Sequence, residues 1–304
     1  MTRTPPAFLG AHGSGSRGLT SPRTGKAKLK TTVTKQTPTV RLELESRPES
    51  VTLVRGMLVG IGEELALEAE LLDDLKTAVS EACNNVVMHA YGDRLGPMTV
   101  DFELAAGQME ISVRDRGGGI RGVSASHDRM GVGLAVISAL ADRSEFVNLP
   151  EGGTEVRMSF TGRGTKPALE RAEAHDWPKD LDGDVVARLS SARLLKGVLG
   201  RLARAMAAQA HFSVDRVSEL YPVTDALAAH AEAAASSHGI GFAIVAGDRR
   251  LEVIIGKFRT GSSAGLREET DTASPLRLLA DEVSVEMDGD SELLRVVVAD
   301  TRQG

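Results

Sequence analysis

The chain runs twice through the same order of hydrophobic patterns. Apolar residues at every second position predict a strand at residues 40–44, and apolar residues spaced three and four apart then predict two helices, the first ending near residue 65 and the second at about 68–90. A capping box, Ser46 to Glu49, is expected to begin the first helix. The run continues with expected strands at residues 98–104, 109–114, 144–149 and 155–160 and a helix at about 131–141. This order predicts an α/β two-layer sandwich.

A polar stretch with Pro167 and Pro178, residues 163–184, is expected to be a linker between the two runs. The second run repeats the element order, with expected helices at 190–210, 214–235 and 275–280 and strands at 242–245, 251–256, 282–287 and 293–299. Short fragments also resemble one another, such as residues 139–146 and 278–285. The sequence therefore predicts a duplicated domain, with residues 39–162 as the first copy and 185–304 as the second.

Composition indicates a cytoplasmic globular protein. The chain is 41% hydrophobic and 26% charged, and its single cysteine, Cys83, rules out an intramolecular disulfide. No Cys/His cluster has the spacing of a structural zinc site, and no apolar run is long enough to suggest contact with a membrane interior.

The net charge of −6 is unevenly distributed. The first 40 residues hold seven Lys or Arg and no Asp or Glu, so the remainder carries −13. Residues 1–38 are also rich in Ser, Thr, Pro and Gly, which predicts a disordered basic tail, with a nucleic-acid-binding arm as the alternative. The acidic remainder disfavours nucleic acid and suits a basic protein partner.

One face of the second predicted helix carries polar residues. Glu81, Asn85 and His89 follow one another at intervals of four, which places them on the same side. A carboxylate and an amide oxygen one turn apart can act as a base and as a ligand for a hard cation such as Mg²⁺. A solvated helix face is the alternative interpretation.

Two glycine-containing segments add candidate ligand contacts. Asp115 ends a predicted strand and precedes Gly117 and Gly119, so its carboxylate can accept a hydrogen bond from an amine while the glycines allow close approach of a flat ring. Gly131 and Gly133 open an apolar helix whose free N–H groups can face a phosphate. A turn is the alternative for the first segment, and a lone Gly-x-Gly is weak evidence for the second.

Two single residues complete the candidate set. Arg129, just before Gly131, is positioned to meet a terminal phosphate, and Thr154 opens the last strand, where its hydroxyl can approach a base. An ordinary first residue of a strand is the alternative for Thr154.

In this order and spacing, the motifs resemble the GHKL (histidine-kinase-like) ATPase superfamily. The stretches VSEACNNVVMHAYGD and VRDRGGGI are most similar to the bacterial anti-sigma-factor serine kinases. The resemblance implies a Bergerat-type ATP-binding fold that uses ATP and Mg²⁺. It further implies the general base Glu81, the magnesium ligand Asn85 and the adenine contact Asp115.

The resemblance also implies a pocket and partners. Four glycines would shape the nucleotide pocket, with two further residues at its margins: Gly117, Gly119, Gly131 and Gly133, then Arg129 and Thr154. The substrate would be a serine of an anti-anti-sigma (STAS-type) protein, and the ATP-bound domain would otherwise hold a sigma factor. A non-catalytic ATP-binding regulator is the alternative function, and Glu81→Gln distinguishes the two, because only a kinase loses turnover.

Two departures from the family pattern carry expectations of their own. The loop at residues 121–129 is shorter than the family's usual lid, which implies weaker closure over the nucleotide. If His230 is set against His89, Pro222 and Ala226 replace Glu81 and Asn85, and Gly256 or Lys257 replaces Asp115. The second copy is therefore expected to be degenerate and to bind no ATP. The chain is expected to be either a homodimer, as is common in the family, or a monomeric pseudo-dimer.

Overall fold

The strands bury alternate residues against a layer of helices. In the first strand, Val40, Leu42 and Leu44 are buried, whereas Arg41 and Glu43 between them are only half-buried. The buried strand residues share one hydrophobic core with the apolar sides of the helices. The alternating apolar residues of the strands and the apolar sides of the helices therefore pack against each other in one interface.

A computed structural model describes residues 39–105, 108–119, 132–161, 177–178, 180–237, 239–266 and 275–301. All of them belong to one compact unit, Thr37–Gly304. The predicted tail, residues 1–38, and most of the predicted linker lie outside the described residues.

The first half contains the strands and helices of one α/β sandwich. They are β1 (Val40–Glu45), α1 (Pro48–Leu65), α2 (Ala69–Asn85), the π-helical turn η1 (Val86–Ala90), β2 (Pro97–Ala105), β3 (Gln108–Asp115), α3 (Val132–Leu140), β4 (Arg143–Asn148) and β5 (Thr154–Thr161). The predicted capping box is wrong. The Ser46 hydroxyl instead accepts the Gly96 N–H (3.0 Å). Arg47 is the N-cap of α1, where its side chain makes no capping hydrogen bond to the described backbone, and Pro48 lies in the first turn.

The second half repeats this order of strands and long helices. Its elements are β6 (Val185–Leu189), the 3₁₀ turn η3 (Ala192–Leu194), α4 (Leu195–Gln209), α5 (Val214–Ala234), β7 (Ile240–Gly247), β8 (Arg250–Arg259), the 3₁₀ turn η4 (Ala264–Leu266), α6 (Pro275–Leu279), β9 (Glu282–Asp288) and β10 (Ser291–Ala299). The sequence did not predict β6.

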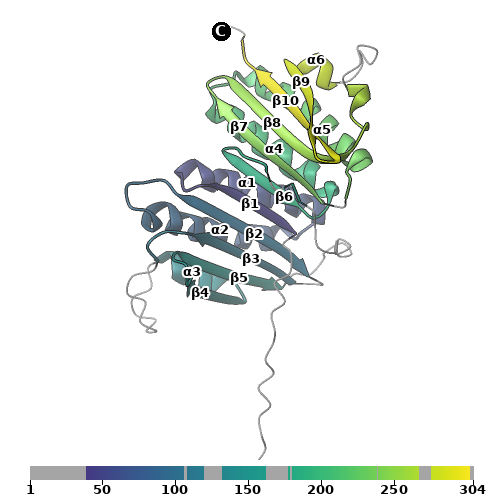
Figure 1. Ribbon diagram of the computed structural model, residues 1–304. Helices are drawn as coiled ribbons and strands as arrows, with labels where there is room; N and C mark the ends of the chain where they lie inside the picture. Colours follow the sequence, from purple (N-terminus) through teal and green to yellow (C-terminus); the bar gives the residue numbers. More distant parts are fainter. Residues whose placement is uncertain are drawn as a thin grey trace, which may run out of the picture. The chain divides into compact units, whose positions relative to one another are not determined.

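The ten strands of the described residues form one antiparallel sheet in the order β4-β5-β3-β2-β1-β6-β7-β8-β10-β9. The order reads the same from both ends when β1 to β5 are matched with β6 to β10. The helices cover one face of the sheet and lie behind it in Figure 1. The predicted two-layer α/β sandwich and its duplication are therefore confirmed.

The two halves meet at a pseudo-two-fold axis. A shift of 145 residues takes Leu42 to Ala187, which is its pairing partner across β1 and β6. The same shift takes Gly56 of α1 to Arg201 of α4, and a Cβ on Gly56 would lie 3.8 Å from the Cβ of Arg201. Because each residue faces its own counterpart, both contacts mark the axis.

Close helix packing reinforces this junction. A Cβ on Gly60 would lie 2.1 Å from the carbonyl oxygen of Gly197, and a Cβ on Gly197 would lie 2.5 Å from that of Gly60. No side chain fits at such distances, so glycine at both positions lets α1 and α4 approach backbone to backbone.

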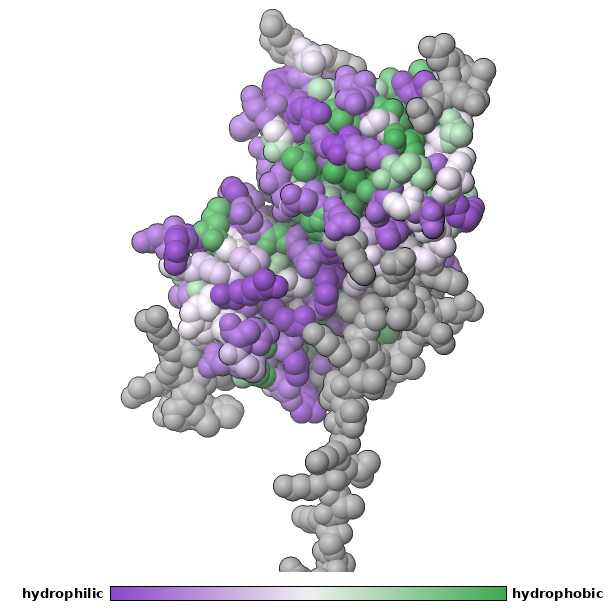
Figure 2. Space-filling view, viewed as in Figure 1, coloured by the Kyte–Doolittle hydropathy of each residue, from purple (hydrophilic) through white to green (hydrophobic). Residues whose placement is uncertain are grey.

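The uncovered face of the sheet differs between the halves (Figure 2). Over the first half it is polar, and a chain of ion pairs crosses the strands: Arg41–Asp101 (2.7 Å), Asp101–Arg114 (2.8 Å), Arg114–Glu155 (2.5 Å) and Glu155–Arg157 (2.5 Å). Over the second half hydrophobic side chains gather above β7 and β8, where Leu181, Val186 and Ala243 form a separate small cluster with Ile254 packed against it.

Candidate functional site

The predicted polar face of α2 meets the start of α3. A Cβ on Gly133 would lie 2.8 Å from Glu81 Oε2 and 3.5 Å from Asn85 Oδ1. The first turn of α3 therefore lies against this pair, and only glycine leaves the carboxylate its present position. His89, one turn further along, is exposed.

Asn85 contributes an unusual group to this junction. Its side-chain amide nitrogen is buried and has no hydrogen-bond partner among the described residues. A buried polar group without a partner is costly, so this amide is suited to a ligand that enters between α2 and α3. The adjacent oxygens of Glu81 and Asn85 are of the type that Mg²⁺ prefers.

Asp115, at the end of β3, forms the second part of the site. It is only 5% exposed, and its Oδ1 accepts the Gly117 N–H at 2.8 Å. Burial raises the pKa of this carboxyl, and hydrogen bonds from Gly117 and from the backbone and hydroxyl of Thr154 partly offset that shift. The strand end thus presents a carboxylate that is held from both sides.

Glycines allow the backbone to close around Asp115. A Cβ on Gly117 would lie 2.0 Å from the Ala90 carbonyl oxygen, and a Cβ on Gly153 (φ +90°) would lie 2.1 Å from the Asp115 carbonyl oxygen. Gly119 has φ +73°, a conformation that favours glycine. The turn after β3 is therefore packed between the end of η1 and the start of β5.

The structure thus assembles two groups of predicted site residues: Glu81, Asn85 and Gly133 in one, and Asp115, Gly117 and Thr154 in the other. Arg129, Gly131 and the short lid at residues 121–129 lie outside the described residues. Sequence reasoning missed Tyr91, whose hydroxyl accepts the Arg116 N–H at 2.7 Å next to Asp115. A lone tyrosine after a helix carries no signal of such a contact.

The equivalent helix in the second half has lost the polar pair. A shift of 145 residues superposes the buried residues of α2 and α5: Leu75 on Leu220, Ala78 on Val223, Val79 on Thr224, Ala82 on Leu227 and Cys83 on Ala228. It places Ala226 at the position of Glu81 and His230 at that of Asn85. Matching His230 with His89 is therefore wrong by one helical turn, because burial and not the shared histidine sets the register.

The strand residues of the site have also changed. The β2–β3 hairpin ends at the pair Ala105–Gln108, and the β7–β8 hairpin ends at the pair Gly247–Arg250. Matching these two end pairs places Lys257 of β8 at the position of Asp115 of β3. In the last strands, Asn148 opposite Thr154 corresponds to Met287 opposite Glu292.

Two hydrogen bonds from backbone N–H groups to aspartate side chains support this last register. Asp142 accepts the Thr161 N–H (2.6 Å), and Asp281 accepts the Ala299 N–H (2.7 Å) in the same place. The separation in sequence between Thr154 and Thr161 equals that between Glu292 and Ala299. Glu292 therefore stands at the position of Thr154.

A turn of the chain occupies the corresponding space in the second half. Ser263, which is fully buried, lies 3.2 Å from His230 Nε2 and donates its N–H to Glu292 at 3.0 Å. Gly261 donates its N–H to the same carboxylate at 2.6 Å. Burial lowers the pKa of His230, which favours a neutral imidazole in this cluster.

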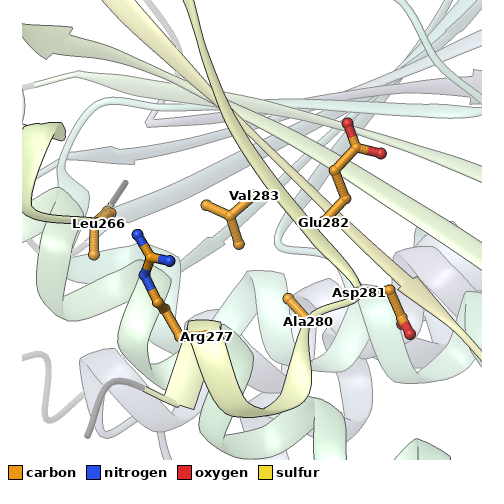
Figure 3. Close-up of a pocket in the computed structure, with 6 residues that line it drawn as sticks. All are labelled: Leu266, Arg277, Ala280, Asp281, Glu282 and Val283. Carbon is orange, nitrogen blue, oxygen red and sulfur yellow. The ribbon is translucent and has the colours of Figure 1, made fainter. Parts of the chain in front are cut away.

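A cavity of about 260 Å³ lies elsewhere in the second half (Figure 3). It is lined from η4, α6 and β9, and the Nε and Nη2 atoms of Arg277 on its wall are buried without a hydrogen-bond partner within the described ranges. It shares no residue with either group of site residues.

The described residues offer neither a membrane span nor a ready-made metal cluster. No helix described is both long and apolar enough to cross a membrane. No group of three or more His, Cys, Asp or Glu in the described ranges could hold a metal ion. A site with one or two protein oxygens fits Mg²⁺, which commonly keeps water and phosphate oxygens as its other ligands.

The family model described as a histidine kinase-like ATPase domain matches residues 44–160. An anti-sigma F factor of Caldanaerobacter subterraneus subsp. tengcongensis is 30% identical over 135 residues, which are 41% of this chain and 94% of that protein. The serine-protein kinase RsbW of Bacillus cereus is 26% identical over 138 residues, which are 41% of this chain and 86% of that protein.

A solved structure of RsbU and RsbW domains from Mycobacterium tuberculosis is 26% identical. The match covers 42% of this chain and 33% of that chain with a TM-score of 0.33, too low to support a statement about the fold.

Proposed function

Because this chain belongs to the histidine-kinase-like ATPase family of the anti-sigma F factors and RsbW serine-protein kinases, we propose that it is a cytoplasmic, ATP-dependent serine kinase and anti-sigma factor. Its substrate would be a serine of a STAS-type anti-anti-sigma protein, and its alternative partner a sigma factor. The observation that carries the proposal is the meeting of Glu81 and Asn85 with Gly133 at the start of α3.

In the proposed mechanism, Asp115 and Thr154 bind the adenine end of ATP. The buried Asp115 carboxylate accepts a hydrogen bond from the exocyclic amine, and its contacts to Gly117 and Thr154 hold it in position. The glycines of the adjoining turn let the ring lie against the backbone.

The phosphate end of ATP would enter between α2 and α3. There the Asn85 side-chain oxygen would hold Mg²⁺, which neutralises phosphate charge when bound, and the unpartnered amide of Asn85 would donate to the nucleotide. Gly133 lies in the first turn of α3, where N–H groups are free to donate to phosphate. Arg129 and Gly131 would complete the contact to the terminal phosphate.

Glu81 would act as the general base. It accepts the proton of the substrate serine as the serine oxygen attacks the γ-phosphorus, the bond to the β-γ bridging oxygen breaks, and ADP leaves. Positioning and charge neutralisation supply most of the rate in phosphoryl transfer, so a single carboxylate at this place is sufficient chemistry.

The second half would bind no ATP and would serve as a structural partner of the first. Ala226, His230, Lys257 and Glu292 replace the four site residues, and the turn with Ser263 occupies the space. Since β6 and α4 cover the β1 edge and the adjoining side of α1, we propose a monomeric pseudo-dimer and not a homodimer through this surface.

The test is phosphate transfer to a purified STAS-domain anti-anti-sigma protein with Mg-ATP, followed by mass spectrometry for phosphoserine. The proposal expects a phosphoserine with the wild type and none with Glu81→Gln, while both bind ATP. A protein that binds ATP but transfers phosphate to no STAS protein, and whose behaviour does not depend on Glu81, would instead be a non-catalytic regulator.

A further inference from the structure

Tyr91 lies where the helix that carries Glu81 and Asn85 gives way to the chain leading into β2. Its hydroxyl donates to the Pro97 carbonyl oxygen (2.6 Å) and accepts the Arg116 N–H (2.7 Å). A Cβ on Gly96 would lie 2.3 Å from the ring, so the glycine leaves room for it. The tyrosine therefore connects the first residue of β2 with the residue that follows Asp115.

The π-helical turn η1 sets up this contact. Its last residue, Ala90, accepts the Gly118 N–H at 3.0 Å, and Gly117 packs directly against the same carbonyl. π-helical turns are rare and occur frequently at functional sites. Here the turn aims both the Ala90 carbonyl and the Tyr91 ring at the segment after β3.

From these contacts we propose that Tyr91 is a positioning residue for the nucleotide. Its hydroxyl fixes the Asp115–Gly119 turn relative to the α2 face that holds Asn85, so that the adenine and phosphate contacts of one ATP are met together. This role rests on the proposed ATP site. Tyr91 itself touches neither Glu81 nor Asn85 through any described hydrogen bond.

The electrostatics of Tyr91 agree with this position. Burial raises the pKa of the phenol, the Arg116 N–H lowers it, and the nearby Asp115 carboxylate raises it further. The phenol therefore stays protonated near neutral pH and can donate and accept at once, which both of its hydrogen bonds require.

The chain offers a matched control. Of its two tyrosines, Tyr221 lies in α5 of the second half, is 53% exposed, and carries the Arg204 guanidinium 3.6 Å above its ring centre. Tyr221→Phe keeps the ring and removes a hydroxyl far along the chain from the site. It therefore reproduces the chemical change of Tyr91→Phe without the contact to Arg116.

The experiment is calorimetry of Mg-ATP and Mg-GTP on the full-length wild type, Tyr91→Phe and Tyr221→Phe. We expect Tyr91→Phe to bind ATP roughly tenfold more weakly, about the effect of one hydrogen bond, with GTP affinity unchanged. The preference for ATP should then fall by the same factor, because Asp115 no longer meets the adenine amine in register. Tyr221→Phe should match the wild type for both nucleotides.

A purely structural tyrosine would lower the melting temperature of Tyr91→Phe and leave the ATP-to-GTP preference unchanged. That outcome, in a wild type that binds ATP, overturns the role of Tyr91 alone. Failure of the wild type to bind ATP overturns the proposed site and this role with it.

A second measurement needs no change at Tyr91. In Tyr221→Phe, Tyr91 is the only tyrosine, so its ionisation can be followed by ultraviolet absorbance. Saturating Mg-ATP should raise the pKa of Tyr91 further, because the immobilised turn holds the protonated phenol in both hydrogen bonds. An unchanged titration with bound ATP would contradict the proposal.

Discussion

The two halves of this protein share a topology but differ at four candidate site positions. Residues that pack α2 recur in α5 at a constant shift, and the sheet order is mirrored about the β1–β6 pair. Glu81, Asn85, Asp115 and Thr154 correspond instead to Ala226, His230, Lys257 and Glu292. The residues that specify the fold and those that specify its chemistry are therefore separate sets, and one set has been kept where the other was lost.

In the second half, a turn of the chain contacts the residues that correspond to the candidate site. Glu292, where the first half has Thr154, holds the turn that inserts Ser263, and His230 contacts the serine from the helix side. In the proposed account, this hydrogen-bonded cluster of His230, Ser263 and Glu292 stands where the first half would receive a ligand. By contrast, the Asn85 amide nitrogen of the first half is buried and has no partner in the part of the chain that the structure describes.

The largest difference between the halves is expected from the general base. Glu81→Gln should lower the rate of phosphate transfer by roughly 10²- to 10⁴-fold, the usual contribution of such a base, with ATP affinity retained. Ala226→Gln, the matched change in the second half, should leave the rate unchanged. Initial rates with labelled ATP check both, and equal losses in the two variants would erase the distinction between the halves.

The next largest effect concerns the adenine contact. Asp115→Ala removes a charged acceptor, and loss of such a hydrogen bond, about 1.5–3 kcal/mol, should weaken ATP binding roughly 10- to 100-fold. Lys257→Ala changes the equivalent strand position and should have no effect on ATP affinity. Calorimetry on both variants decides, and weaker binding in Lys257→Ala would place a nucleotide in the second half.

Substitution of one glycine of α1 at the junction between the halves should destabilise the protein, whereas substitution of another should be tolerated. Gly60→Ala forces a Cβ into the Gly197 backbone and should lower the free energy of unfolding by about 1–3 kcal/mol. Gly56→Ala has its nearest neighbour at 3.8 Å and should raise that free energy by roughly 0.5–1 kcal/mol through helix propensity. Urea titrations measure both, and a tolerated Gly60→Ala would argue against the close crossing of α1 and α4.

The smallest difference between the halves is expected in the urea concentration at which each unfolds. Burial raises the pKa of the Cys83 thiol to about 12, so native Cys83 should resist thiol reagents near neutral pH. Moving the thiol to its counterpart, by Ala228→Cys in a Cys83→Ala background, probes the second half. Because one sheet and one core join the halves, labelling rates should rise together with urea, and separate transitions would show that the halves unfold independently.

Much of this fold was predictable because it rests on burial patterns that repeat along the chain. The helix expected to end near residue 65 ends at Leu65, and the alternation at residues 109–114 falls within β3. The strand β6 was missed, because Val185–Leu189 is short and becomes a strand by pairing with β1. Tertiary pairing of this kind leaves little local signal.

The candidate site could be predicted where residue type suggests chemistry. Asp115 with its glycines and the Glu81–Asn85 pair were predicted from the spacing of carboxylate, amide and glycine, and the structure brings the residues within each of these groups together. The turn at η1 could not, because a π-helical turn leaves the apolar pattern of α2 unbroken through Val86. The role of Tyr91 and the register of His230 depend on that turn and on packing, and both emerged only from the structure.

One measurement tests the central claim most directly, namely that a single functional site lies in a chain whose second half replaces a partner subunit. Mg-ATP calorimetry with light scattering on the full-length protein gives the number of sites and the mass together. The account predicts one ATP per chain and a monomer. Two sites per chain, or a dimer that dissociates when the β1 or α1 surface is altered, would contradict it.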